Sequence, residues 1–133
     1  MFNSAIKLSD LQLIVMKILW EQGKLTVSEV HALANEQREL ALTTVATLLK
    51  RMQEKNIVAF EKQGRQHVYF ALVSEKDVKS SMLGNMLQHL FDGKPADLVH
   101  HLVGQEEINQ DDLLKIKQLL SQENKISQGS NND

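Results

Sequence analysis

The spacing of apolar residues changes once along this chain, from a helical period to alternation. Apolar side chains recur every three or four residues in the segments 8–23, 26–36 and 41–56, which predicts three amphipathic helices. Between residues 57 and 72 they alternate on either side of the turn sequence QGRQ, which predicts a β-hairpin. Three helices followed by a hairpin is the element order of a winged helix-turn-helix, whose third helix enters the major groove of DNA.

The expected ends of these helices carry capping signals. Ser9 or Asp10 can cap the first helix, and Thr26, followed three residues later by Glu29, forms a capping box ahead of the second. Asn56 follows the third helix as its C′ residue, a position that favours a left-handed backbone. The boundaries predicted from periodicity and from capping therefore agree.

The third predicted helix has an unusual polar face. Its apolar stripe faces inward, and the opposite side begins with three threonines and continues with two cations. Threonine is a mediocre helix former, but its hydroxyl and methyl groups can contact base edges closely, and cations further along can reach phosphates. For Thr43 the N-cap and the DNA contact are equally good interpretations, and for the whole face contact is favoured. The predicted contacts of this helix, residues 43–55, are Thr43, Thr44, Thr47, Lys50 and Arg51.

Charge is distributed unevenly along the chain, although the formal net charge is only −2. Residues 1–73 carry nine Lys/Arg and seven Asp/Glu, whereas residues 74–133 carry six and ten. Between residues 50 and 67, five cations accompany only two glutamates. A charge run of this kind is as often plain solvated surface as a nucleic-acid footprint, so the basic segment supports DNA binding only together with the threonine face.

Three further amphipathic segments follow the hairpin, at 74–91, 95–102 and 109–120. Ser74 and Asn109 suit N-cap positions, and Pro95 suits a first helical turn. Helices this short cannot readily bury all their apolar stripes against one another, so a second copy of the chain is the favoured cover, and folding back onto the first domain is the alternative. The predicted dimer interface comprises Val78, Met82, Met86, Leu90, Leu98, Leu102, Leu113, Ile116 and Leu120.

Other kinds of site find little support in the sequence. There is no cysteine, which excludes disulfides, thiolate metal sites and cysteine nucleophiles. The five histidines lack the paired spacing of metal ligands, and no nucleophile turn accompanies the serines. We therefore expect no enzyme, no metal site and no cofactor. With no secretory signal at the start and no apolar run of roughly 18 residues, we expect a cytoplasmic protein without a membrane partner.

The segments LSDLQLIVMKILWEQGKLTVSEV, TTVATLLKRMQEKN and GRQHVYFAL together resemble the penicillinase-repressor family, which includes regulators of β-lactamase and methicillin resistance and copper-responsive relatives. The resemblance is close over residues 8–72 and looser over the helical remainder. It implies a homodimeric repressor whose recognition helix reads a palindromic operator, with a C-terminal helical domain for dimerisation. Carried residue by residue, the operator contacts fall on Thr43, Thr44, Thr47 and Arg51 of the helix and on Arg65 and His67 of the wing.

The chain also departs from the pattern of that family. Ala41 stands where members often carry a serine cap, which favours a helix start at Thr43, and Asn56 replaces the usual glycine. The C-terminal half contains neither the Asn-Phe bond at which antibiotic-responsive members are cleaved nor the cysteine motif of the copper-responsive branch. The resemblance therefore implies neither of these two releasing signals, and we expect an unknown protease or sensor as an additional partner.

These observations predict a mainly α fold with a small β-hairpin wing (α+β), a winged helix-turn-helix followed by a helical dimerisation domain. We expect a DNA-binding domain at 1–73, a dimerisation domain at 74–123 and a disordered tail at 124–133. The predicted function is repression of transcription from operator DNA. The alternative is a winged-helix module for protein–protein assembly, which would favour large aromatic residues and methionine on the third helix rather than the Thr, Lys and Arg found there.

Overall fold

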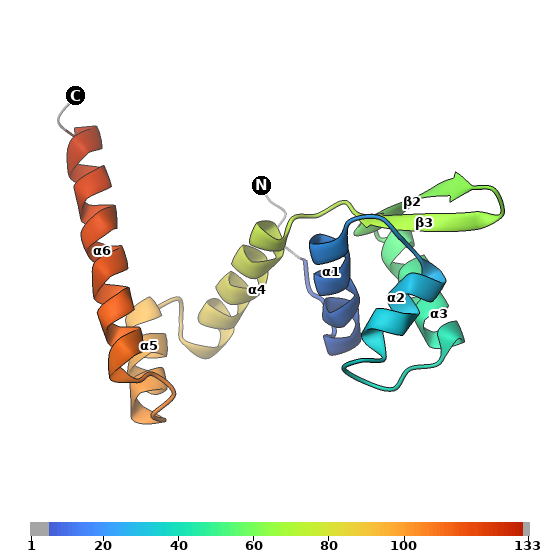
Figure 1. Cartoon of the computed structure of the whole chain (residues 1–133). Helices are drawn as coiled ribbons and strands as arrows, with labels where there is room; N and C mark the ends of the chain where they lie inside the picture. The colour runs from blue at the N-terminus through green and yellow to red at the C-terminus, as the bar shows by residue number, and fades with distance from the viewer. Residues whose placement is uncertain (1–5, 132–133) are drawn as a thin grey trace. The chain divides into compact units, whose positions relative to one another are not determined.

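The computed structural model describes the backbone of residues 6–131 and the side chains of residues 6–122. Its contacts divide the chain into two units, Met1–Asn85 and Met86–Asp133, which we describe separately. The elements of the first unit are α1 Asp10–Gln22, β1 Leu25–Thr26, α2 Val27–Ala34, α3 Leu42–Glu54, β2 Val58–Gln63, β3 Gln66–Ala71 and the beginning of α4 Glu75–Leu90 (Figure 1). The predicted winged helix-turn-helix is thereby confirmed.

The hairpin is part of a sheet of three strands in the order β1-β3-β2. The central strand β3 pairs with both neighbours antiparallel, so that Tyr69 lies opposite Phe60 on one side and opposite Leu25 on the other. The sequence pattern does not predict β1, because a strand of two residues is too short for apolar and polar residues to alternate recognisably. This short strand positions the start of α2 beside the hairpin, since α2 begins directly after Thr26.

The core of the first unit receives side chains from every long element. Its members are Leu8, Val15, Met16, Leu19, Val30, Val45, Leu49, Met52, Ile57, Val58, Tyr69 and Val78. Burial raises the pKa of the Tyr69 phenol above its ordinary value of 10.0. Because Val78 lies in this core and Met82 packs against it, the first unit continues into α4, beyond the boundary after residue 73 that the sequence suggested.

Side-chain caps start four of the helices. Ser9 and Gln12 form a capping box on α1, and the predicted box of Thr26 and Glu29 on α2 is confirmed, with the Thr26 Oγ1 accepting from the Glu29 backbone N–H at 3.2 Å. The Ser74 hydroxyl accepts from the third residue of α4 at 3.0 Å, as predicted. These bonds satisfy backbone donors that a helix start otherwise leaves without a partner.

The second unit contains the end of α4, α5 Pro95–Gly104 and α6 Gln110–Asn131. Asn109 caps α6 by accepting from the Asp112 backbone N–H at 2.8 Å, as predicted. No residue from 86 to 122 is buried. The tail that the sequence predicted to be disordered, 124–133, falls where side chains lie outside the described residues, and α6 runs through Asn131. Within the described residues, every helix is too short or too polar to span a bilayer.

Candidate nucleic-acid interface

The outer face of α3 is open to solvent. Val45, Leu49 and Met52 are fully buried on the inner side, whereas Thr43, Thr47, Lys50 and Arg51 are exposed and Thr44 is half-buried. Among the described residues, no hydrogen bond occupies the hydroxyl groups of the three threonines. The structure thus brings all five predicted helix residues onto one helix of the first unit, with their polar groups available to a ligand.

The start of α3 differs from the sequence expectation. The helix begins at Leu42, with Ala41 as N-cap and no side-chain cap hydrogen bond. The interpretation of Thr43 as the cap is therefore wrong, because Thr43 is already the second helical residue. Alanine can take the extended N-cap backbone, φ −72° and ψ 150°, without supplying a side-chain acceptor. Both Thr43 and Thr44 consequently keep their hydroxyls for other contacts.

The end of α3 turns sharply into the first wing strand. The predicted C′ residue Asn56 has a positive φ of 62°, as a C′ residue requires. The backbone N–H of Ile57 donates to Met52 at 2.9 Å, and that of Asn56 donates to Gln53 at 3.0 Å, which is the hydrogen-bond pattern of a Schellman motif. This motif fixes the direction in which β2 leaves α3.

The turn between α2 and α3 is held by two side chains, His31 and Asn35, that the sequence pattern does not predict there. The Leu40 carbonyl oxygen lies 2.8 Å from His31 Nε2 and accepts from Asn35 Nδ2 at 3.1 Å. The Asn35 side-chain oxygen in turn accepts from the Leu40 backbone N–H at 3.1 Å. These bonds connect the end of α2 with the residues just before α3. The signal in the sequence that could have indicated this role is Asn35, a polar residue at the end of α2 just before the turn.

The wing ends in a two-residue loop, because Gln63 pairs with Gln66. Gly64 takes a positive φ of 63° there, and Arg65 is exposed beside it. His67 is only half exposed, since its ring stacks on Phe60 with a centroid distance of 4.0 Å. The two predicted wing residues thus differ: Arg65 is free at the tip, and His67 belongs to an aromatic stack along the hairpin.

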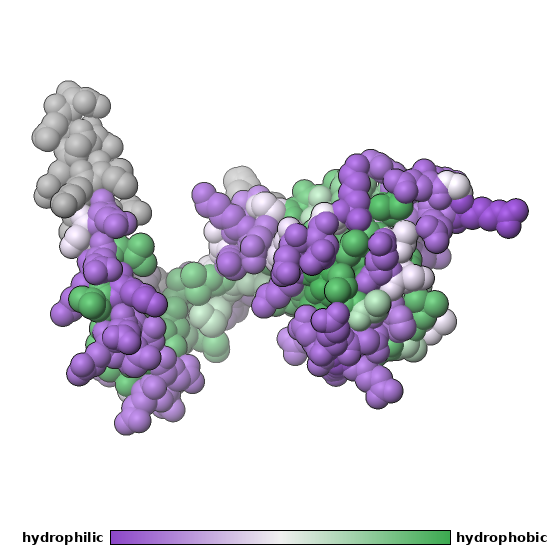
Figure 2. Space-filling model, in the orientation of Figure 1, coloured by the Kyte–Doolittle hydropathy of each residue, from purple (hydrophilic) through white to green (hydrophobic). Residues whose placement is uncertain are grey.

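Ion pairing within the first unit leaves the basic segment unneutralised. Glu61, on the wing, is paired with Lys24 at 2.8 Å. Within the part of the chain that the structure describes, the only other ion pair is Lys79–Glu75 on α4. Among the side chains that the structure describes, the five cations of the segment 50–67 therefore have no acidic partner. The projecting end of the hairpin is hydrophilic in Figure 2. Its loop also faces α2 across a cleft of about 260 Å³ lined by Thr26, Val27, Ser28, Arg65, Gln66 and His67.

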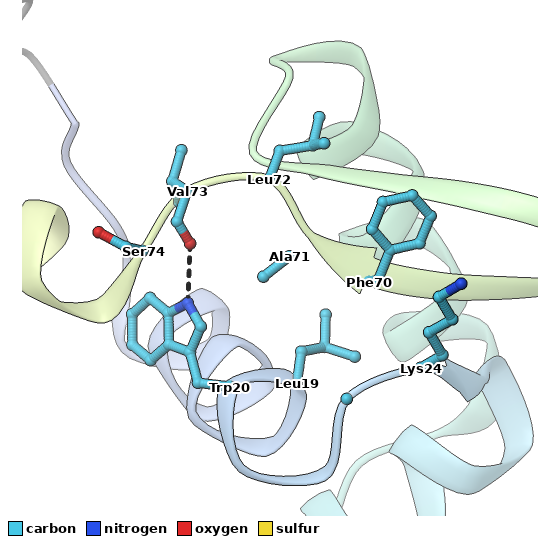
Figure 3. Close-up of a pocket in the computed structure, with 9 residues that line it drawn as sticks. Leu19, Trp20, Lys24, Phe70, Ala71, Leu72, Val73 and Ser74 are labelled. Carbon is cyan, nitrogen blue, oxygen red and sulfur yellow. Dashed lines mark hydrogen bonds between the residues drawn. The ribbon is translucent and has the colours of Figure 1, made fainter.

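A second hollow, of about 410 Å³, lies between the end of α1 and the end of β3. Figure 3 shows the Trp20 indole N–H donating to the Val73 carbonyl oxygen, a bond of 2.9 Å. This bond ties α1 to the segment that leads into α4. None of the predicted DNA contacts lines this hollow.

The nine residues predicted to form the dimer interface fall into two groups. Val78 and Met82 pack within the first unit. The remaining seven belong to the second unit, where Leu90 is 72 % exposed, Leu120 59 % and Leu113 36 %, and where Met86, Leu98, Leu102 and Ile116 are half-buried. Further large apolar side chains are exposed beside them, namely Val99, Val103, Leu114 and Leu119. Hydrophobic side chains (green) accordingly appear on this unit in Figure 2.

The histidines do not gather into a metal site within the described residues, where no cluster of three His, Asp or Glu side chains has suitable positions. His31 braces the turn before α3, and His67 stacks on Phe60. His101 packs edge-on against Phe91 at 5.9 Å.

A family model described as "Penicillinase repressor" matches residues 8–122. The transcriptional regulator BlaI of Mycobacterium tuberculosis is 33 % identical over 106 residues, covering 76 % of this chain and 77 % of that protein. The methicillin resistance regulatory protein MecI of Mammaliicoccus sciuri is 25 % identical over 121 residues, covering 91 % and 98 %. A crystal structure of a MarR mutant from E. coli shares the fold, with a TM-score of 0.51 and 14 % identity over 87 % of this chain and 77 % of that chain.

Proposed function

The chain belongs to the penicillinase repressor family, and from this premise we propose that it is a homodimeric transcriptional repressor that reads a palindromic operator. The observation that carries the proposal is the outer face of α3, where the exposed Thr43 and Thr47 precede two exposed cations, Lys50 and Arg51, that have no ion-pair partner among the described residues. Thr43, Thr44 and Thr47 contact base edges in the major groove, where short hydroxyl and methyl groups allow close approach.

The cations around this face bind the DNA backbone. Lys50 and Arg51 follow the threonines by one to two turns, so they meet the phosphates that border the groove. Arg65 at the tip of the wing reaches a neighbouring phosphate, and His67 supports the wing through its stack on Phe60. Pairing of Glu61 with Lys24 lowers the repulsion that a wing glutamate would exert on the phosphates.

The second unit supplies the dimer contact. A stable interface buries on the order of 800 Å² on each partner, and its centre is apolar. The exposed leucines of α4 and α6 provide such a surface, with Leu90, Leu113 and Leu120 as its most open predicted members. We assign Val78 and Met82 to the support of α4 on the first unit, and the dimer contact to Met86, Leu90, Leu98, Leu102, Leu113, Ile116 and Leu120.

Dimerisation explains how a domain with few cations can hold a specific site. One winged helix offers a contact on the order of 600–1,000 Å², which is small for specific binding at physiological salt. Two linked copies read half-sites roughly 34–36 Å apart, or a multiple of that spacing, and the linkage raises affinity through effective concentration.

The protein acts in the cytoplasm, and a protease or sensor protein is the partner that ends repression.

Selection of DNA by the full chain tests this function. Purified protein is incubated with random duplexes, and the retained duplexes are sequenced over several rounds. We expect enrichment of an inverted repeat. The protein in which Lys50 and Arg51 are both replaced by Ala serves as a matched control and should enrich nothing. Retention of duplexes without any shared sequence by the unaltered protein would contradict the proposal.

A further inference from the structure

Leu42, the first residue of α3, is a large apolar side chain left in solvent beside the threonine face. It is 47 % exposed, and it is not among the residues that pack against the core of the first unit. Leu40, two residues earlier, does pack there, and its backbone is held by Asn35. The core therefore does not require a leucine at position 42. The first turn of a helix ordinarily favours Pro, Asp or Glu.

The first two turns of α3 present methyl groups and hydroxyls and no long polar side chain. Leu42 and Ala46, four residues apart, lie along one edge of the outer face formed by Thr43 and Thr47. Specific reading of guanine uses Arg or Lys, and reading of adenine uses Asn or Gln. None of these residue types occurs between residues 42 and 49, and the first long donor is Lys50.

The only apolar group that a base pair presents in the major groove is the 5-methyl group of thymine. We propose that Leu42 is a specificity-determining residue that packs on a thymine methyl group. In this inference, which rests on the proposed function, the DNA ligand carries a thymine opposite the first turn of α3 in each half-site. This contact removes apolar surface of the Leu42 side chain from water by packing it against the thymine 5-methyl group.

Replacement of thymine by deoxyuridine tests this contact, because it removes the 5-methyl group and leaves base pairing unchanged. The probe is the inverted repeat selected by the full chain, with each thymine of a half-site replaced in turn, symmetrically in both halves. For the unaltered protein we expect one position at which uracil weakens binding about fourfold in each half-site, the size of one buried methyl group. For Leu42→Ala, uracil at that position should change the dissociation constant less than about twofold, as expected for a coupled pair.

Two variants keep the result interpretable. Leu72→Ala removes an equally exposed leucine, 51 % in solvent, that lines the hollow beside Trp20, and it should retain full sensitivity to uracil. Leu42→Met keeps an apolar side chain, so its binding should retain most of the sensitivity to uracil. Fluorescence of Trp20 verifies that each variant is folded.

The possible outcomes separate this inference from the function on which it rests. If the unaltered protein enriches an inverted repeat but tolerates uracil at every position, the thymine contact is refuted and the repressor function stands. If Leu42→Ala loses as much on uracil as the unaltered protein, the methyl contact belongs to another residue and the assignment to Leu42 is refuted. If no sequence is enriched, the proposed function itself fails.

Discussion

The two units of this chain keep their apolar side chains in different places. In the first unit, side chains from the helices and from the hairpin meet in one buried cluster, and side-chain caps begin α1, α2 and α4. In the second unit, no described residue is buried, and leucines on α4 and α6 are largely exposed. The first unit can therefore be stable within one chain. The second exposes apolar side chains of the kind that obligate interfaces bury, and this exposure supports the proposed dimer.

The largest expected effect comes from the core of the first unit. Leu49→Ala should lower the free energy of unfolding by about 2–5 kcal/mol, because it leaves a cavity among fully buried neighbours. Urea unfolding followed by the fluorescence of Trp20, the single tryptophan, reports on this unit alone. Leu119→Ala, at a residue 60 % exposed in the single chain, is the matched control and should leave the Trp20 transition unchanged. Equal losses for both variants would contradict the contrast between the units.

Shortened chains test where the first unit ends. A chain ending at residue 85 retains Val78 in the core, whereas a chain ending at residue 73 does not. We expect the shorter chain to be less stable by about 1.5–3 kcal/mol, the value of one buried valine side chain, in the same urea experiment. Both should be monomeric and bind a single half-site weakly. Equal stability of the two chains would place the boundary of the unit before α4.

The threonine face should affect DNA affinity without affecting assembly. We expect Thr47→Ala to weaken binding to the selected operator by about 1 kcal/mol, the low end of a good base contact, and to change binding to random DNA little. Fluorescence anisotropy measures both affinities. A loss of equal size on operator and random DNA would assign Thr47 to positioning or folding instead.

The smallest expected effect concerns the wing. Arg65→Ala should weaken binding to all duplexes and should make the log–log salt dependence shallower by about one unit for each half-site, because one phosphate contact is lost. Lys17→Ala is the control, since Lys17 is an exposed cation on α1 of the same unit, and it should leave the slope unchanged. An unchanged slope for Arg65→Ala would indicate that this side chain reads a base or supports the fold.

Sequence periodicity was sufficient to predict the first three helices and the hairpin, because each buries one face in the first unit. The stripe of α3 illustrates this, since Val45, Leu49 and Met52 are all fully buried. The face opposite an apolar stripe is determined at the same time, so the exposure of Thr43 and Thr47 could also be predicted. The prediction that these residues contact DNA used both their outward position and the chemistry of their side chains.

The remainder depended on contacts that a local pattern does not encode. The stripe of α4 predicts an apolar face but not which surface covers it, so Val78 could not be assigned to the core of the first unit. The strand β1 is too short for alternation to be measured. The start of α3 was misplaced because Ala41 adopts the cap conformation without a capping side chain. The brace formed by Asn35 on Leu40 joins residues across a turn whose geometry the sequence does not specify.

In the proposed function, the second unit pairs two chains so that their first units read an inverted repeat together. Sedimentation equilibrium of the full chain, alone and with the selected duplex, tests it most directly, with Leu120→Lys as the variant and Gln118→Lys as the matched control on the same helix. We predict a particle of twice 15.1 kDa for the unaltered chain and for the control, and one duplex bound by each pair. Leu120→Lys should sediment as a monomer and should bind the inverted repeat no better than a half-site. A monomeric unaltered chain that binds one half-site as tightly as the full repeat would contradict the claim.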